Sequence, residues 1–247
     1  MNWSRTEDFK IRGYEVGPDE KVPVQSLCGY MEEAASLHAA ELGFSVEALH
    51  SRGFAWALAR MQMELYALPA AEDLVRVKTW PVAVEKLQYR RDFLLTGPGE
   101  RGGETVLAKA VTDWVVINLD SRRVERVPQF IYALQPADPE YVLEKEKLRL
   151  EGQEGAPELA SFRVRKSDID RNRHVNNVRF LDWLLESVPE EISGSRKLRG
   201  LQVMYRAEAV YGDTVLARGA ACEGGFLHGL FRRDDGQELV RAKSFWR

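Results

Sequence analysis

The chain has little cysteine and no long apolar run. Its two cysteines, Cys28 and Cys222, lie far apart and match no metal-ligand spacing, which is typical of packed free thiols in a reducing compartment. No stretch approaches the roughly 18 uncharged apolar residues of a membrane span, and the first ten residues lack the apolar core of an export signal. We therefore expect a soluble, unexported, cytoplasmic protein with no membrane partner.

The chain also lacks an excess of charge of either sign and has few histidines. Its 35 Lys and Arg against 38 Asp and Glu give a net charge of -3, which argues against broad nucleic-acid binding. His38, His50 and His228 are isolated and have no ligand-spaced partner, so we expect no metal and no cofactor, and we place these three at the surface or the core edge. In contrast, 45% hydrophobic residues in 247 are ample for a core.

The pattern of apolar residues predicts the same order of elements twice. In the first half, a strand at 9–16 and a helix at 30–42 precede strands at 55–67, 74–80, 87–96 and 105–119. In the second half, a strand at 162–165 and a helix at 177–188 precede strands at 199–210, 214–222, 227–233 and 238–246. An offset of 140 aligns Gln62 with Gln202 and Asp73 with Asp213, which indicates a duplicated unit.

These elements predict an α+β protein of two tandem units, each an antiparallel sheet wrapped around one main helix. Glycine-rich 97–103 and Asp-Asp-Gly at 234–236 fit hairpin loops, and the first precedes no helix as a phosphate-binding loop would. We divide the chain into 1–134, an exposed connector at 135–160 that could contain a short helix, and 161–247. The connector holds three prolines and the charge-dense stretch 144–147.

The densest group of polar side chains is the run from Asp168 to Asn177. It holds two carboxylates, an imidazole and three amides, directly ahead of the second predicted helix. Free amide N–H groups at the start of a helix favour negative charge, as does a reaction that builds charge on a carbonyl oxygen. The run therefore predicts an active-site loop.

Residues 170–177 resemble the catalytic segment of acyl-ACP thioesterases, the plant and bacterial enzymes that end fatty-acid synthesis. The similarity extends to Phe180, Trp183, Glu186-Ser187, Tyr205-Arg206-Ala207-Glu208 and the Gly212-Asp213 turn. The resemblance implies a double hot-dog fold, hydrolysis of fatty acyl-ACP, acyl carrier protein as the partner, and catalytic roles for Asp170, Asn172, His174 and Glu208. Plant members carry a cysteine after the glutamate, whereas this chain has Ala209, so a cysteine nucleophile is excluded and water activated by a carboxylate is expected.

Thioester hydrolysis needs a base for water and donors for the oxyanion, because a thiol of pKa near ~8.5 departs without a strong acid. We expect Asp170 or Glu208, the latter in the adjoining strand, to take the proton from water. Asn172 and the helix-start amides would position the carbonyl, and His174 would orient the water or share the proton. The alternative for Asp170 and Asn172 is helix capping. We expect Asn176 to tie down the loop and Asn177 to begin the helix.

Two further surfaces are predicted for the substrate. Six Lys or Arg against two Asp between 162 and 180 could receive an acidic carrier protein, and we assign docking to Arg171, Arg173 and Arg179, with a solvated face as the alternative. For the acyl chain we assign Phe54, Trp56, Met61 and Met63 in the first half, with ordinary core as the alternative. One catalytic site per chain follows, and the first half serves the acyl group.

Three other readings differ in substrate or in activity. The Asp-x-x-x-His-Val-Asn-Asn pattern also occurs in hot-dog thioesterases that act on coenzyme A esters. A non-catalytic acyl-ligand sensor would bind without turnover, and a hot-dog dehydratase lacks support because its His-Phe-Pro pattern is missing. Fusing two halves leaves a homodimer optional, and the sequence does not rank acyl chain lengths.

Overall fold

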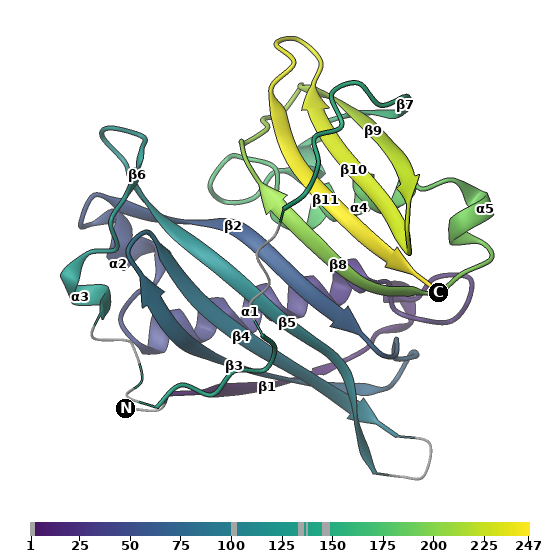
Figure 1. Ribbon diagram of the computed structural model, residues 1–247. Helices are drawn as coiled ribbons and strands as arrows, with labels where there is room; N and C mark the ends of the chain where they lie inside the picture. Colours follow the sequence, from purple (N-terminus) through teal and green to yellow (C-terminus); the bar gives the residue numbers. More distant parts are fainter. Residues whose placement is uncertain (1–2, 100–102, 133–135, 137, 145–148) are drawn as a thin grey trace. The chain divides into compact units, whose positions relative to one another are not determined.

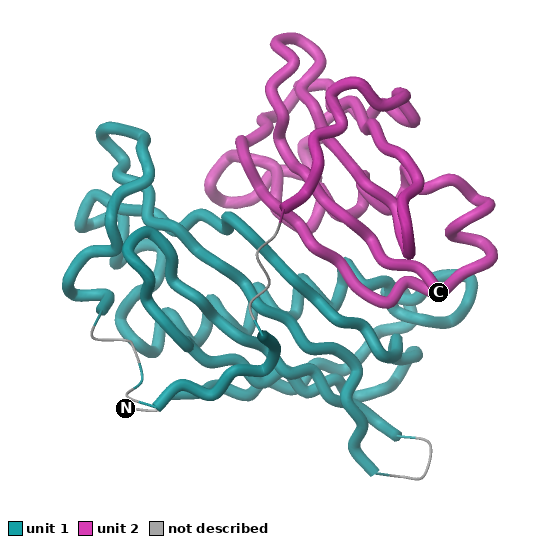
Figure 2. The backbone as a smooth tube through the Cα atoms, viewed as in Figure 1, with its two compact units in different colours: residues 1–145 teal, residues 146–247 magenta. Residues whose placement is uncertain are grey.

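The computed structural model describes residues 3–99, 103–132, 136, 138–144 and 149–247, and the chain divides into two compact units (Figures 1 and 2). Unit 1 spans Met1–Lys145 and unit 2 spans Glu146–Arg247. Each unit contains one antiparallel sheet and one long helix that packs against it. The α+β class and the repeated order of elements are therefore confirmed.

In unit 1, α1 lies against a five-stranded sheet of order β1-β3-β4-β5-β2, with the short β6 paired to β5. Tyr30 of the helix stacks on Phe9 of β1, with ring centroids 4.7 Å apart. The elements are β1 (Arg5–Lys10), η1 (Gly13–Glu15), α1 (Val24–Glu41), α2 (Val46–His50), β2 (Phe54–Leu65), β3 (Leu74–Glu85), β4 (Gln88–Pro98), β5 (Glu104–Asn118), β6 (Val124–Glu125) and α3 (Gln129–Tyr132).

In unit 2, α4 lies against a five-stranded sheet of order β8-β11-β10-β9-β7. Phe226 of β10 packs with Val188, just beyond the end of α4, and with Trp246 of β11. The elements are β7 (Glu158–Arg163), η2 (Lys166–Asp168), α4 (Asn177–Glu186), α5 (Glu190–Ser193), β8 (Leu198–Tyr205), β9 (Thr214–Cys222), β10 (Gly225–Arg232) and β11 (Glu238–Trp246).

The bounds of some elements differ from the prediction. The strand expected at 9–16 is wrong in its second half, because β1 ends at Lys10 and residues 13–15 form a 3-10 turn. The helix expected from residue 30 begins at Val24, where Pro23 supplies an extended N-cap and Leu27 and Met31 already face the core. The short helices α2, α3 and α5 were not predicted, since one helical turn leaves little periodic signal.

A β-bulge divides β2. The register between β2 and β5 shifts by one residue between Leu58 and Arg60. Because side chains alternate between the two faces of a strand, the extra residue moves the odd-numbered side chains onto the face that the even-numbered ones occupy before the bulge. One face of β2 therefore carries the apolar residues Phe54, Trp56 and Leu58 before the bulge and Met61, Met63 and Leu65 after it.

The connector is tied to the sheets over its described parts. In unit 1, Trp80 Nε1 donates to the Glu140 carbonyl at 2.8 Å, and Arg90 Nη2 donates to the Leu143 carbonyl at 2.6 Å. In unit 2, Gln153 is 6% exposed and β7 already begins at Glu158. Most of the described connector residues are exposed, as predicted, and Gln153 is the buried exception among them. Residues 145–148 of the charge-dense stretch, and 100–102 of the first hairpin loop, lie outside the described residues.

Two of the three isolated histidines are fully buried, so their predicted place at the surface or core edge is wrong. His38 is 0% exposed, and its Nδ1 lies 3.0 Å from Arg91 Nη1, a guanidinium whose pKa burial lowers. His228 is 1% exposed, and its Nε2 lies 2.7 Å from Ser244 Oγ. Burial lowers the pKa of His228 to about 3, so the ring is neutral in the folded protein at pH 7. His50 is exposed.

Candidate active site

Residues 170–174 form a closed loop immediately before α4. Ile169 and Val175 pair as an antiparallel bridge across its base. Inside it, the Asp170 amide donates to the His174 carbonyl at 2.9 Å, and the Arg173 amide donates to the Asp170 carbonyl at 3.0 Å. Arg173 adopts a left-handed conformation, with φ of 66°, which lets the chain reverse in so few residues. The loop is therefore held by its own backbone.

Asp170 and Asn172 contact each other within this loop. The backbone N–H of Asn172 donates to Asp170 Oδ1 at 2.7 Å, and its side-chain Nδ2 donates to Asp170 Oδ2 at 3.2 Å. This is an Asx-type turn, in which a carboxylate satisfies an amide two residues on. Helix capping by either residue, the alternative in the sequence, is wrong, because Asn176 caps α4.

Asn176 ties the loop to the helix, as predicted. Its Oδ1 accepts from the Val178 amide at 2.8 Å, and its carbonyl accepts from the Arg179 amide at 2.9 Å. Asn177 is the first residue of α4, which was also predicted. Because Asn176 engages two of the first amides of α4, fewer N–H groups face a substrate carbonyl than the sequence suggested.

Asp168 closes the η2 turn that precedes the loop, a role the sequence did not indicate. Its side chain is 1% exposed and accepts from the Arg165 amide at 2.7 Å and from Arg165 Nη2 at 2.9 Å. Burial alone would raise the pKa of Asp168, but the bonds from Arg165 outweigh it and hold the pKa below its ordinary value. The spacing of three residues between Arg165 and Asp168, typical of a capped turn, is the signal that could have found this role.

His174 and Glu208 are in contact, although 34 residues separate them (208 − 174). His174 Nε2 lies 3.2 Å from Glu208 Oε2, and the two side chains are 29% and 58% exposed. Glu208 does not lie in a strand as expected, because β8 ends at Tyr205 and residues 206–210 form a loop. A loop position leaves the carboxylate open to water while one oxygen faces the imidazole.

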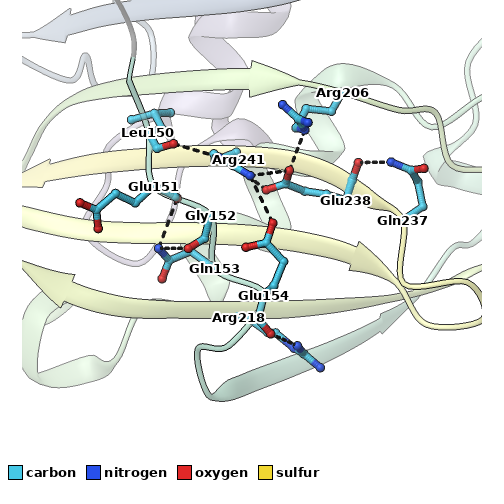
Figure 3. Close-up of polar contacts among 10 residues, drawn as sticks. All are labelled: Leu150, Glu151, Gly152, Gln153, Glu154, Arg206, Arg218, Gln237, Glu238 and Arg241. Carbon is cyan, nitrogen blue, oxygen red and sulfur yellow. Dashed lines mark hydrogen bonds and ion pairs between the residues drawn. The ribbon is translucent and has the colours of Figure 1, made fainter.

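The Glu208 loop, defined as residues 206–210, is bonded on both sides of the glutamate. The Ala209 carbonyl accepts from the Val175 amide at 2.9 Å, one residue beyond His174. At its start, Arg206 Nε lies 2.6 Å from Glu238 Oε2, and Glu238 is 8% exposed (Figure 3). These contacts fix the loop relative to the residue that follows His174.

Arg241 connects this ion pair to the connector (Figure 3). Its Nε lies 2.7 Å from Glu238 Oε1, and its Nη1 donates to the Leu150 carbonyl at 3.0 Å. Its Nη2 also lies 3.3 Å from Glu154 Oε1. A buried carboxylate between two guanidiniums is compensated, and the same network holds residues 150–154 on the sheet of unit 2.

Unit 1 repeats the backbone of this site without its side chains. An offset of 153 relates Gly17 to Asp170 and Lys21 to His174, and the Gly17 amide donates to the Lys21 carbonyl at 2.9 Å. An offset of 140 relates Pro69 to Ala209, and the Pro69 carbonyl accepts from the Val22 amide at 2.9 Å. The same offset places Leu68 at the position of Glu208. Unit 1 therefore has Gly17, Lys21 and Leu68 at the positions of Asp170, His174 and Glu208.

The predicted docking arginines differ in their surroundings. Arg171 and Arg173 are exposed on the 170–174 loop. Arg179 lies in the first turn of α4, where its Nη1 is 3.0 Å from Asp182 Oδ2. That ion pair reduces the positive charge that Arg179 offers to a partner.

The four predicted acyl-binding residues all lie on β2 but have two environments. Phe54 and Trp56 are half-buried and pack on an apolar cluster that includes Tyr89, whose ring centroid is 5.3 Å from that of Trp56. Met61 and Met63, beyond the bulge, are 3% and 2% exposed. The structure thus joins the first pair to an aromatic cluster and buries the second pair.

Within residues 3–99, 103–132, 136, 138–144 and 149–247, no group of three or more His, Cys, Asp or Glu could hold a metal ion. No helix in these ranges combines the length and apolar character needed to cross a membrane.

Comparisons with known proteins identify the relatives of this chain. Residues 3–134 match the model of the acyl-ACP thioesterase N-terminal domain, and residues 152–247 match that of the C-terminal domain. Oleoyl-acyl carrier protein thioesterase 1 of Arabidopsis thaliana is 30% identical over 99% of this chain and 76% of its own length. Palmitoyl-acyl carrier protein thioesterase of Gossypium hirsutum is 31% identical over 98% of this chain and 63% of its own length.

Solved structures show the same fold. The 12:0-ACP thioesterase from Umbellularia californica superposes with a TM-score of 0.86 at 25% identity, covering 100% of this chain and 98% of that one. An acyl-ACP thioesterase from Bacteroides thetaiotaomicron superposes with a TM-score of 0.84 at 23% identity, covering 100% and 98%. The two tandem hot-dog units expected from the sequence are thereby confirmed.

Proposed function

The chain belongs to the acyl-ACP thioesterase family, and from that membership we propose that it hydrolyses the thioester of a fatty acyl-ACP to a free fatty acid and ACP. The observation that carries the proposal is the contact of His174 Nε2 with Glu208 Oε2 at 3.2 Å, beside the loop closed by Asp170 and Asn172. An imidazole and a carboxylate in contact can take a proton from water at neutral pH and return it.

Glu208 is the base in this proposal. Its carboxylate takes a proton from water, the hydroxide oxygen bonds to the thioester carbonyl carbon, and the carbon–sulfur bond breaks. The thiolate then receives the proton from Glu208. A thiol of pKa near ~8.5 is a good leaving group, so no separate strong acid is required. The solvent exposure of the Glu208 side chain, 58%, and its contact with His174 support this role.

Asp170 and Asn172 position the carbonyl. One hydrogen of Asn172 Nδ2 is donated to Asp170, and the amide has a second hydrogen for the thioester oxygen. A donor held in place before the reaction stabilises the developing oxyanion at little further cost. Unit 1 has Gly17, Lys21 and Leu68 at the positions of Asp170, His174 and Glu208, which supports one catalytic site per chain.

We propose that the first unit receives the acyl chain, with Phe54, Trp56, Met61 and Met63 along its slot. Burial of Met61 and Met63 on one face of β2 supports this assignment, because thioether side chains adapt to apolar ligands. The relatives are named for 12:0, palmitoyl and oleoyl groups, so family membership does not fix the chain length.

Acyl carrier protein docks through Arg171, Arg173 and Arg179 in this proposal, and Asp182 pairs with Arg179. Two exposed arginines beside the reacting groups suit an acidic protein, and the association should weaken with salt.

We also propose that the enzyme acts in the cytoplasm, and that a homodimer is not needed because the catalytic residues all come from residues 170–208 of one chain. A monomer in sedimentation that retains turnover supports the latter, and turnover restricted to a dimer contradicts it.

Hydrolysis of acyl-ACPs of graded length, with the matched acyl-CoAs and free thiol as the readout, tests the proposal. A higher kcat/KM on ACP than on CoA is expected. Equal or faster hydrolysis of the CoA esters would make the chain a coenzyme A thioesterase, and binding without turnover would make it a sensor. In the same assay Asp170→Asn should lose most activity, and retention would remove Asp170 from the mechanism.

A further inference from the structure

Arg232, the last residue of β10, contacts the Glu208 loop directly. Its Nη2 donates to the backbone carbonyl of Glu208 at 2.6 Å. Its other nitrogens are also engaged, since Nε donates to Asp213 Oδ2 at 3.1 Å and Nη1 donates to Asp235 Oδ2 at 2.7 Å. A planar guanidinium with three directed bonds has little freedom, so the Glu208 carbonyl is held against a rigid group.

Asp213 gives the same loop a second tie. Its Oδ2, which accepts from Arg232, also accepts from the Val210 amide at 3.0 Å. Glu208 and Val210 are thus bonded to one ion pair, directly and through Asp213. Between them, the Ala209 carbonyl accepts from the amide of Val175. The backbone from the Glu208 carbonyl to Val210 is therefore fixed relative to the residue after His174.

Unit 1 contains the same turn, and no arginine of its described residues bonds Asp73 there. Asp73 Oδ2 accepts from the Ala70 amide at 2.8 Å, as Asp213 does from Val210, at the offset of 140. Arg232 lies opposite Val215 in the β9–β10 pair, and in unit 1 Gly97 follows Thr96, the partner of Arg76 in the β3–β4 pair. Gly97 itself has no side chain with which to bond the turn.

In unit 1 the turn therefore forms without a bond from a described arginine, beside the segment that carries Leu68. In unit 2 the turn includes Arg232, beside the loop that carries Glu208. We propose that Arg232, supported by Asp213, is a positioning residue that holds the Glu208 backbone so that the carboxylate meets His174. The inference rests on the proposed function, in which Glu208 is the base. It assigns to Arg232 a part in turnover that the fold of the turn does not require.

Kinetics of Arg232→Met on acyl-ACP test the inference. Since a displacement of about 1 Å in a catalytic group costs on the order of 100-fold, kcat should fall about 10- to 100-fold, with KM changed less than about threefold. Arg232→Lys, which keeps the charge but not the fork, should recover part of the loss. Arg233→Met is the matched control, because the neighbouring Arg233 donates to Ser161 Oγ and not to the Glu208 loop. It should retain the wild-type kcat.

A double-mutant cycle separates this inference from the proposed function. If Arg232 acts through Glu208, Arg232→Met should lower kcat little further in a Glu208→Gln background. If the two substitutions lower kcat independently, so that their fold-losses multiply in the double variant, the positioning role is overturned. An unchanged kcat in Arg232→Met would overturn it as well. Full activity of Glu208→Gln alone would instead overturn the assignment of the base. If Arg232→Met does not fold, as judged by circular dichroism, the same cycle with Arg232→Lys decides.

Discussion

The buried imidazole of His228 makes the stability of unit 2 depend on pH. His228 lies on β10, 1% exposed, with its ring centroid 5.0 Å from that of Phe226, which packs beside the end of α4. Burial lowers its pKa from 6.5 to about 3, because the charged ring would be desolvated. In the unfolded chain the same ring is hydrated and takes up a proton near pH 6.5.

The sign follows from this difference in pKa. Between pH 6.5 and 3 the unfolded state binds a proton that the folded state does not. The free energy of unfolding is therefore highest above pH 6.5 with respect to this group, and it decreases as the pH falls toward 3. From pH 8 to pH 5 the free energy of unfolding should fall by about 2 kcal/mol from this group alone. That is a large part of the stability of a typical domain.

Guanidinium chloride unfolding at pH 8 and pH 5, followed by circular dichroism, measures the effect. His228→Gln, which keeps a polar group but cannot titrate, should lose about 2 kcal/mol less than the wild type between these two pH values. His50→Gln, at an exposed position, should behave as the wild type does. An unchanged pH dependence in His228→Gln, or a His228 ring that titrates near pH 6.5 by NMR, would refute the reasoning.

Three further predictions concern the helix start, the carrier and the acyl chain. Asn176→Ala removes the cap of α4 and should lower the free energy of unfolding by about 1 kcal/mol in denaturation; no loss would deny the cap its stabilising role. Charge reversal at Arg171 and Arg173 should raise KM for acyl-ACP and spare a small acyl thioester, whereas equal effects on both substrates argue against docking. Met61→Ala should shift the preference in an acyl-ACP series toward longer chains, and an unchanged profile removes Met61 from the slot.

Local features of the fold were predictable because their signals are local. Asn177 begins α4 as predicted, since a polar run there meets a helical apolar pattern. The bounds predicted for β9 and β11, Thr214–Cys222 and Glu238–Trp246, are confirmed to the residue because glycine and aspartate turns punctuate them. The short α2 and α5 were missed because single helical turns have no period to detect.

The non-local features were not predictable from patterns. Nothing in the spacing of His174 and Glu208 predicts their contact, and it was the resemblance to a family that brought Glu208 into the site. The counterpart loop at Gly17–Lys21 was missed because its hydrogen bonds are made by the backbone, while its side chains differ from those at 170–174. The burial of His228 depends on α4 and β11 packing around it, which a lone histidine does not reveal.

The central claim is that the Glu208 carboxylate, in contact with His174, drives water onto the acyl thioester. The most direct measurement is kcat for free thiol release from one acyl-ACP by the wild type, by Glu208→Gln and by Glu186→Gln, an exposed carboxylate at the end of α4. We predict turnover by the wild type, an unchanged kcat for Glu186→Gln, and a fall on the order of 100- to 10,000-fold for a folded Glu208→Gln that still binds acyl-ACP. A Glu208→Gln variant with most of the wild-type kcat would contradict the account.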